Sequence, residues 1–321
     1  MAEIDSKDRQ ILYQLDLNAR ESFSKIGKKV GLSKEVVGYR VKRMEKLGII
    51  KGFYALIDMG KLGYLSCRFF LKFMKDSPKK EKEIIQYFIN HPKYWWVDSI
   101  DGLYDVGVVC WEKSVFDFHK RRIELMAKFR DSIKEFNQSI YTAFYVYRRA
   151  YLTNKTSSEM QYTKICCNGT TADYDDTDLK ILKIIADNAR AQTIEIAKKL
   201  GVSETVIKYR IKKMINNGII QGFRAMLDLN KIGYYWYKIE FELEDYTKKD
   251  AMLKFFEIHP NIVYAYETVG GSDIEIELEV ESHEKFRKVL NEIREKFPEA
   301  ILSYQHQLWF KEHKLLYFPM Q

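Results

Sequence analysis

The stretch from Gly31 to Tyr64 constrains the fold most, because the chain contains it twice. It reads GLSKEVVGYRVKRMEKLGIIKGFYALIDMGKLGY, and the stretch from Gly201 to Tyr234, offset by 170 residues, reads GVSETVIKYRIKKMINNGIIQGFRAMLDLNKIGY. The alignment needs no gap, and 17 of its 34 positions are identical. Such self-similarity at a fixed offset indicates an internal duplication. Whatever this stretch does is therefore expected twice in the molecule.

Each copy of the stretch predicts a helix followed by a β wing. Ser33 and Ser203 are expected N-caps, since a serine oxygen can accept a bond from an amide of the first turn. Gly48 and Gly218 stand where a helix ends in a left-handed residue. Apolar residues recur at helical spacing and form the expected buried stripe; they are Val37, Val41 and Met44, and then Ile207, Ile211 and Met214.

The segment before each stretch completes a helix-turn-helix. Asp5–Leu17 predicts a first helix, residues 24–31 a short second one, and Gly31-Leu32-Ser33 a tight turn into the third. In this motif the last helix enters the major groove of DNA and the preceding helix crosses the backbone. The face of the third helix opposite its apolar stripe is basic. Such a face is either a solvated surface or a surface that contacts DNA, and the helix-turn-helix motif favours contact with DNA.

The residues expected to contact DNA lie on this face in both copies. In the first copy they are Ser33, Lys34, Glu35, Gly38, Tyr39, Arg40, Lys42 and Arg43; in the second they are Ser203, Glu204, Thr205, Lys208, Tyr209, Arg210, Lys212 and Lys213. Two roles stay open for Arg40 and Arg210. Each could contact a phosphate, or could pair with a carboxylate of the first helix such as Asp8 or Asp178.

Beyond each wing the apolar period changes from 3.6 to 2, which predicts strands with one buried face. The order strand, helix, two strands, helix, strand is the ferredoxin-like pattern. The fold class is therefore α+β, with two tandem units. The expected domains are a helix-turn-helix at 1–58, a ferredoxin-like domain at 59–150, a linker at 151–172, a second helix-turn-helix at 173–228 and a second ferredoxin-like domain at 229–321.

Opposite charges on the two expected sheets suggest how the halves dock. The open face of the second sheet carries a row of glutamates, and that of the first carries Arg68, Phe70 and Lys72, with Val109 and Trp111 beside them. Like charges on neighbouring strands repel, so the acidic face is expected against the basic one. The acidic row consists of Glu240, Glu242, Glu244, Glu275, Glu277 and Glu279.

The amino-acid composition limits the kinds of partner that the protein can be expected to bind. The net charge is +8 and the sequence pI is about 9.0, which favours a polyanionic partner. The N-terminal residues lack an apolar signal segment, and no apolar run is long enough to span a bilayer. The four cysteines form no CxxC pair and imply no disulfide framework. A cytoplasmic protein whose partner is double-stranded DNA, and not a membrane, is expected.

These motifs resemble the Lrp/AsnC transcription regulators along almost all of each half. The motifs are Asp5-x-x-Asp8-x-x-Ile11-Leu12, Ile26–Ser33, Arg40–Met44 and Gly48–Phe53, and the series repeats from Asp175 to Phe223. The resemblance implies a sequence-specific DNA-binding regulator. Since family members carry one copy per chain and dimerise through the ferredoxin-like domain, it also implies a covalent pseudo-dimer that could assemble further.

The resemblance also implies an effector site, for a small molecule such as an amino acid, near the turn between the middle strands. The matching residues are Gly102 and Asp105 in the first half, and Gly270, Gly271 and Asp273 in the second. A plain hairpin turn that needs glycine for a positive φ is the competing interpretation. The two copies differ within this turn, so a shared ligand chemistry does not follow.

Two alternatives to a regulator remain at this stage. Sirohaem decarboxylases resemble the same two-domain fold and use His, Tyr and Arg in their cleft, whereas the second strands here read YWWVDSI and IVYAYET, without His or Arg. No metal-ligand spacing and no phosphate-binding glycine loop appear either. No enzymatic activity, cofactor or metal is therefore expected. A purely architectural DNA-binding protein would share the basic helices.

Overall fold

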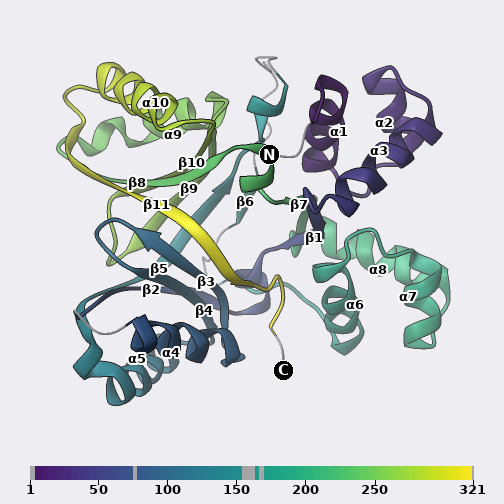
Figure 1. Cartoon of the computed structure of the whole chain (residues 1–321). Coiled ribbons are helices and arrows are strands. Elements are labelled where there is room, and N and C mark those ends of the chain that lie inside the picture. The colour runs from purple at the N-terminus through teal and green to yellow at the C-terminus, as the bar shows by residue number, and fades with distance from the viewer. Residues whose placement is uncertain (1–3, 75–77, 154–162, 166–169, 320–321) are drawn as a thin grey trace.

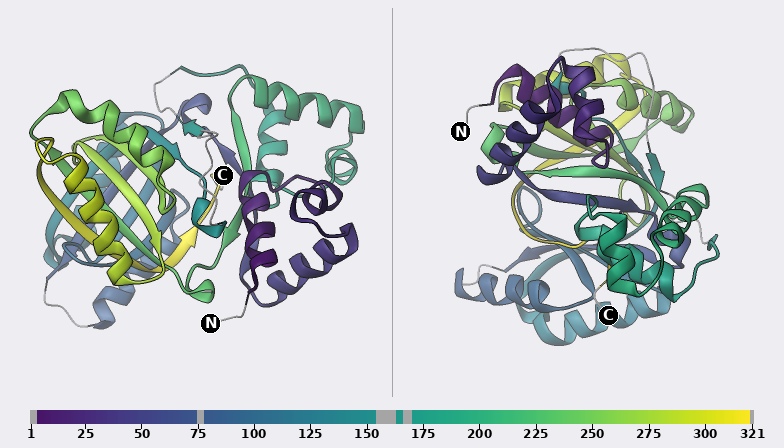
Figure 2. Two further views of the ribbon diagram at one scale, coloured as in Figure 1. Left: turned by 90° about the horizontal axis from the view of Figure 1, so that it is seen from above. Right: turned by 90° about the vertical axis from the view of Figure 1, so that its right-hand side faces the viewer.

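The computed structural model describes residues 4–74, 78–153, 163–165 and 170–319. Two helix-turn-helix units lie together on one side of the molecule, and a β-barrel covered by helices lies on the other (Figures 1 and 2). The helices of the two units are α1 (Ser6–Leu17), α2 (Phe23–Val30) and α3 (Lys34–Lys46), and α6 (Asp176–Asp187), α7 (Thr193–Leu200) and α8 (Glu204–Asn216).

The helix ends follow the local chemistry of the sequence. Asp5 caps α1 in a capping box, because it accepts the N–H of Asp8 while the Asp8 carboxylate accepts the N–H of Asp5. Ser33 and Ser203 cap α3 and α8, as predicted. Gly48 and Gly218 follow these helices with φ of +69° and +73°, in the left-handed region that glycine adopts without strain.

The wings of the two units pair with each other. β1 (Ile50–Ile57) and β7 (Ile220–Leu227) form a two-stranded antiparallel sheet in which Tyr54 lies opposite Arg224. The predicted strand after each third helix is confirmed, and its partner is the corresponding strand of the other unit. One apolar core then runs through both units, including Ile11 and Leu15 of α1 and Ile185 of α6.

The ferredoxin-like halves follow the predicted element order. The first half contains β2 (Leu65–Phe73), α4 (Pro78–Asn90), β3 (Tyr94–Asp101), β4 (Val106–Glu112), α5 (Val115–Phe129) and β5 (Ile133–Val146). The second contains β8 (Tyr235–Leu243), α9 (Lys249–Ile258), β9 (Ile262–Val269), β10 (Ile274–Val280), α10 (His283–Lys296) and β11 (Ile301–Leu315). Short 3-10 turns lie at Met59–Leu62, Arg130–Ser132, Ala150–Leu152, Asn230–Ile232 and Tyr246–Lys248.

The last strand of each half crosses into the sheet of the other half. β5 pairs with β2 from Ile133 to Ile140 and then with β9 as far as Val146. β11 pairs with β8 and then, from Leu308, with β3. The strand order β2-β4-β3-β11-β8-β10-β9-β5 closes through the pairing of β5 with β2. The two halves therefore form one closed barrel, with α4 and α5 on one outer side and α9 and α10 on the other (Figure 1).

The barrel interior is where the two predicted sheet faces meet. Arg68 forms a buried bidentate ion pair with Glu275, at 2.6 Å for Nη2–Oε1, and Lys238 bonds the same carboxylate at 2.5 Å. The prediction is confirmed for Arg68, Glu240, Glu275, Glu277 and Glu279, which are all buried. It is wrong for Lys72, Glu242 and Glu244. These lie near strand ends where water reaches them, and Lys72 pairs within its own half with Asp105.

Most of the predicted linker, at 154–162 and 166–169, lies outside the described residues, as do Cys166 and Cys167. Its described part includes a short strand, β6 (Thr163–Ile165), which pairs with β5. Among the helices that the structure describes, none is long and apolar enough to cross a membrane.

Candidate nucleic-acid interface

The helices α3 and α8 expose the faces that the sequence assigned to DNA. Tyr39 and Tyr209, which correspond in the duplication, are 70% and 67% exposed. Lys42 and Lys212 are exposed one turn further along, and Lys28 and Lys29 of α2 in the first unit are exposed as well. The apolar stripes of both helices are buried, as predicted. Each unit thus presents one aromatic ring and several cations to solvent.

Arg40 and Arg210, for which the sequence left two roles open, form ion pairs with carboxylates at the start of the first helix in each unit. Arg40 contacts Asp5 at 2.7 Å and Asp8 at 2.9 Å, while Arg210 contacts Asp175 at 2.8 Å and Asp178 at 3.0 Å. Backbone N–H bonding at Asp8, together with Arg40, lowers the pKa of the Asp5 carboxyl. These arginines therefore tie the third helix to the first.

The neighbouring basic residues Arg43 and Lys213 also form ion pairs with aspartates. Arg43 also pairs with Asp8, and Lys213 pairs with Asp173 at 3.1 Å. Both side chains remain partly exposed. The exposed Lys42 and Lys212, for which no ion pair is found among the described residues, are consequently strong candidates for phosphate contacts on the two helices.

The two reading faces differ in their own contacts. In α8 the carboxylate of Glu204 pairs with Lys208 at 2.8 Å and accepts the hydroxyl of Thr193 at 2.5 Å. These bonds lower the pKa of Glu204, with Lys208 as the main cause. In α3 the corresponding Lys34 is exposed and carries the opposite charge.

Glycine at position 38 is not required by the fold. A Cβ at Gly38 would lie 3.4 Å from the ring of Phe23, which is an ordinary contact. The packing of the protein thus gives no reason for a glycine here, and close contact between DNA and Gly38 stays a prediction.

Reciprocal backbone contacts hold the two units against each other. The N–H of Ala19 donates to the carbonyl of Phe223, and the N–H of Ala189 donates to that of Phe53. The guanidinium of Arg20 donates to the carbonyl of Ala189 at 2.6 Å, and Arg190 donates in turn to that of Ala19. The turns after α1 and α6 are thus clamped to the opposite wing, so the positions of α3 and α8 are coupled.

The predicted effector turns pack against the strands that cross between the halves. Gly102 has φ +153°, and a Cβ there would lie 2.9 Å from Cβ of Gln307 on β11. Gly270 has φ +84° and faces the backbone carbonyl of Gln138 on β5 in the same way. Gly271 follows it with a φ outside the positive region.

The aspartates of these turns have structural partners. Asp105 pairs with Lys72 at 2.6 Å and accepts the N–H of Phe73 at 2.7 Å. Asp273 accepts the N–H of Leu243 at 2.8 Å. A hairpin turn that needs glycine, and a carboxylate that holds the turn to the neighbouring strand, account for the predicted effector residues. Ligand binding at these turns remains a prediction.

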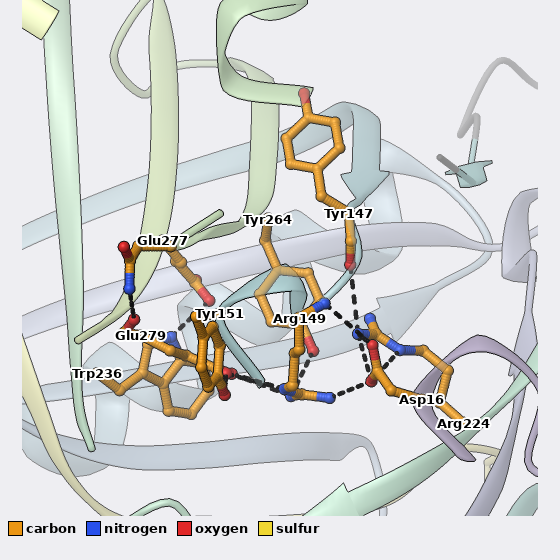
Figure 3. A network of polar contacts seen from close by, with 10 residues as sticks. Asp16, Tyr147, Arg149, Tyr151, Arg224, Trp236, Tyr264, Glu277 and Glu279 are labelled. Atoms are coloured by element: carbon orange, nitrogen blue, oxygen red, sulfur yellow. Dashed lines mark hydrogen bonds and ion pairs between the residues drawn. The ribbon is translucent and has the colours of Figure 1, made fainter. Parts of the chain in front are cut away.

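A buried polar network, which the sequence did not reveal, joins the helix-turn-helix pair to the barrel (Figure 3). Asp16 of α1 accepts bonds from Arg149 at 2.6 Å and from Arg224 of β7 at 2.6 and 2.9 Å. Arg149 also pairs with Glu279 of β10 at 2.8 Å. Burial would raise the pKa of Asp16, but Arg224 and Arg149 hold it below its ordinary value.

The network occupies only one side of the pseudo-symmetric pair. Tyr54 corresponds to Arg224 in the duplication, and its ring stacks on Tyr317 with centroids 3.8 Å apart. Asp16 corresponds to Ala186, which is buried in the apolar core. Positions at which the two copies disagree were the signal in the sequence that could have pointed to this contact.

Comparison with known proteins agrees with this geometry. Residues 4–45 match a model described as an AsnC-type helix-turn-helix domain, and residues 174–221 match one described as winged helix-turn-helix DNA-binding. The chain is 30% identical to the uncharacterised HTH-type transcriptional regulator PH0140 of Pyrococcus horikoshii, over 44% of this chain and 87% of that protein. It is 35% identical to the HTH-type transcriptional regulator Ptr1 of Methanocaldococcus jannaschii, over 35% of this chain and 78% of that protein.

The fold and the matches define a protein with two DNA-binding helix-turn-helix units. The chain belongs to the Lrp/AsnC family of transcription regulators. Among solved structures, that of the sirohaem decarboxylase NirDL aligns with 98% of this chain and 94% of its own, with a TM-score of 0.64 and 12% identity. At that identity the similarity concerns the fold alone, which extends over both halves.

Proposed function

We propose that one chain binds one duplex DNA site as a covalent pseudo-dimer and regulates transcription there, in the cytoplasm. The observation that carries the proposal is the pairing of β1 with β7, together with the single apolar core of the two helix-turn-helix units. Because this arrangement couples α3 and α8, the two helices would enter neighbouring major-groove segments, about one helical turn apart or a multiple of it.

The two half-sites should differ in sequence. Lys34 and Glu35 are exposed at the start of α3, whereas α8 begins with Thr205 and the paired Glu204 and Lys208. Direct readout depends on the donors and acceptors that each helix presents to base edges. An imperfect palindrome is therefore the expected target.

Phosphate contacts should dominate the affinity. Each neutralised phosphate contributes roughly 0.9 to the slope of log affinity against log salt. Replacing Lys42 and Lys212 by Ala should lower that slope by about 2 and weaken all DNA sequences alike. The matched control is Lys254→Ala, an exposed lysine of α9 on the barrel.

Fluorescence anisotropy with a labelled duplex at several salt concentrations measures this slope. The proposal fails if the full chain binds DNA without salt dependence, or if Lys254→Ala has the same effect as the double replacement. Binding with a normal salt slope but with no sequence preference would instead support an architectural role.

An enzymatic function has weaker support. The relatives of similar sequence are named as transcription regulators, and the NirDL structure, which aligns with almost the whole chain, shows the fold alone. Incubation of the protein with sirohaem, followed by its absorbance spectrum, tests the alternative directly. An effector at the Gly102 and Gly270 turns, and assembly beyond one chain, likewise remain part of the proposal.

A further inference from the structure

A cavity of about 370 Å³ lies between the paired wings and the mouth of the barrel. Its lining includes Tyr54 of β1 and Met226 of β7 on one side and Trp96 and Trp309 of the barrel on the other. It is separate from the outer faces of α3 and α8 and from the turns at Gly102 and Gly270. Its size is within the usual range for small-molecule sites.

All five tryptophans of the chain line this cavity. Trp96 and Trp309 meet edge to face with centroids 4.7 Å apart, and Trp95 stacks on Trp111 at 4.9 Å. The indole nitrogens of Trp95 and Trp309 are buried without a hydrogen-bond partner among the described residues. The faces of aromatic rings attract cations, and tryptophan does so most strongly.

Two buried carboxyl groups line the same cavity, and neither forms an ion pair within the part of the chain that the structure describes. Asp98 is 1% exposed, and within the described part of the chain its oxygens have no side-chain hydrogen-bond partner, only the backbone N–H groups of Lys311 and Ser99 nearby. Glu277 is 4% exposed and accepts the indole N–H of Trp236 at 2.9 Å. Burying an acid in this way is unfavourable, so each site of this kind needs an explanation.

Both groups have strongly altered acidity. Burial, with Glu312 and Glu277 adding to it, raises the pKa of Asp98 well above its usual range, and the N–H groups of Lys311 and Ser99 offset this only in part. Burial likewise raises the pKa of Glu277 to about 7. Since nearby negative charges disfavour ionisation, a positive charge placed between these groups would relieve the conflict.

Of the cations near the cavity, Lys311 has an exposed side chain, and the other three are committed elsewhere. Lys51 pairs with Glu312 at 2.7 Å, and Arg149 pairs with Asp16 and Glu279. Lys238, which lowers the pKa of Glu277, bonds to Glu275. The acidic pair is therefore left for a charge that comes from outside the chain.

We propose that this cavity binds a small organic cation with an apolar or aromatic body. Its ammonium group would lie between Asp98 and Glu277, and its body would pack on the tryptophans. Any acceptor on the ligand could take the indole N–H of Trp95 or Trp309. The site spans the wings and both halves of the barrel, and it stands independently of DNA binding.

A charge series of small probes tests this in the purified full chain. Phenethylamine, benzylamine and cyclohexylamine carry the proposed cation, while 2-phenylethanol and phenylacetate are a neutral and an anionic counterpart. Titration calorimetry and the intrinsic tryptophan fluorescence report binding. At least one amine should bind saturably, at least about tenfold more tightly than 2-phenylethanol, with phenylacetate weaker still.

Asp98→Asn removes the negative charge but keeps the shape of the side chain, and removing a buried unpartnered acid should not impair folding. The variant should lose about ten- to a hundredfold of amine affinity. Asp101→Asn, an exposed position on the same strand, should lose none. The proposal is overturned if no amine binds saturably, if phenylacetate binds as well as the amines, or if Asp98→Asn binds amines as the parent does.

Discussion

Replacing Asp16 by Asn should destabilise the protein far more than a typical carboxylate change. Asp16 is 4% exposed, and its carboxylate faces two buried guanidinium groups, Arg149 and Arg224. Arg149 would keep Glu279, whereas Arg224 would lose the carboxylate to which it bonds. Breaking a buried ion pair in this way costs about 3–5 kcal/mol. For a chain of 321 residues, a loss of this size corresponds to a fall in Tm of about 4–7 °C.

Thermal unfolding followed by circular dichroism measures this change. The control is Asp173→Asn, whose exposed pair with Lys213 should contribute no more than about 1 kcal/mol. Adding Arg224→Met to Asp16→Asn should recover most of the loss, because the uncompensated charge is then gone.

The pH dependence supplies a further check. Since the folded pKa of Asp16 lies below its ordinary value of 3.8, its contribution is present above that pH and is lost below it. The difference in Tm between the parent protein and Asp16→Asn should therefore become smaller at acidic pH. A loss for Asp16→Asn no larger than that for Asp173→Asn would refute the reasoning.

Two further changes probe the barrel. Glu277→Gln keeps an acceptor for the indole N–H of Trp236. Because the pKa of Glu277 in the folded protein, about 7, exceeds its ordinary value of 4.5, the parent loses stability progressively as the pH rises from 4.5 to 7. The variant should therefore melt higher than the parent at pH 8 and nearly equal to it at pH 4.5, and the same gain at both would contradict this origin. Gly102→Ala should cost about 1–3 kcal/mol, because the turn has a positive φ and Gln307 lies 2.9 Å from the new Cβ. Gly52→Ala, where nothing lies within 4 Å, is its control in the same melts, and equal losses would argue against strain at the turn.

The sequence predicted the local elements of the fold well, because their signals are local. Capping residues such as Asp5 and Ser33, and the change of apolar period near Leu65, depend on neighbours a few positions away. The charge pattern of the strands also predicted the burial of Arg68 against Glu275. The family resemblance followed from the same short motifs and is confirmed.

The strand pairings and the polar network that join the halves could not be predicted from such local signals. The pairing of β1 with β7 and the crossing of β5 and β11 connect segments from different copies, and a duplication allows several such pairings. Arg149 lies 133 residues from Asp16, and no period relates them. For the cavity, the one signal was an acid, Asp98, among the aromatic and aliphatic residues of the strand YWWVDSI.

The most direct test of the pseudo-dimer is a selection of bound sequences from random DNA with the full chain, read together with the stoichiometry of the complex. We expect an imperfect palindrome whose two half-sites differ and whose centres lie about one helical turn apart or a multiple of it, occupied by one chain. A perfectly symmetric consensus bound by two chains would contradict the proposal, because two copies of the same recognition helix would then contact the DNA. Failure to enrich any sequence would contradict sequence-specific binding itself.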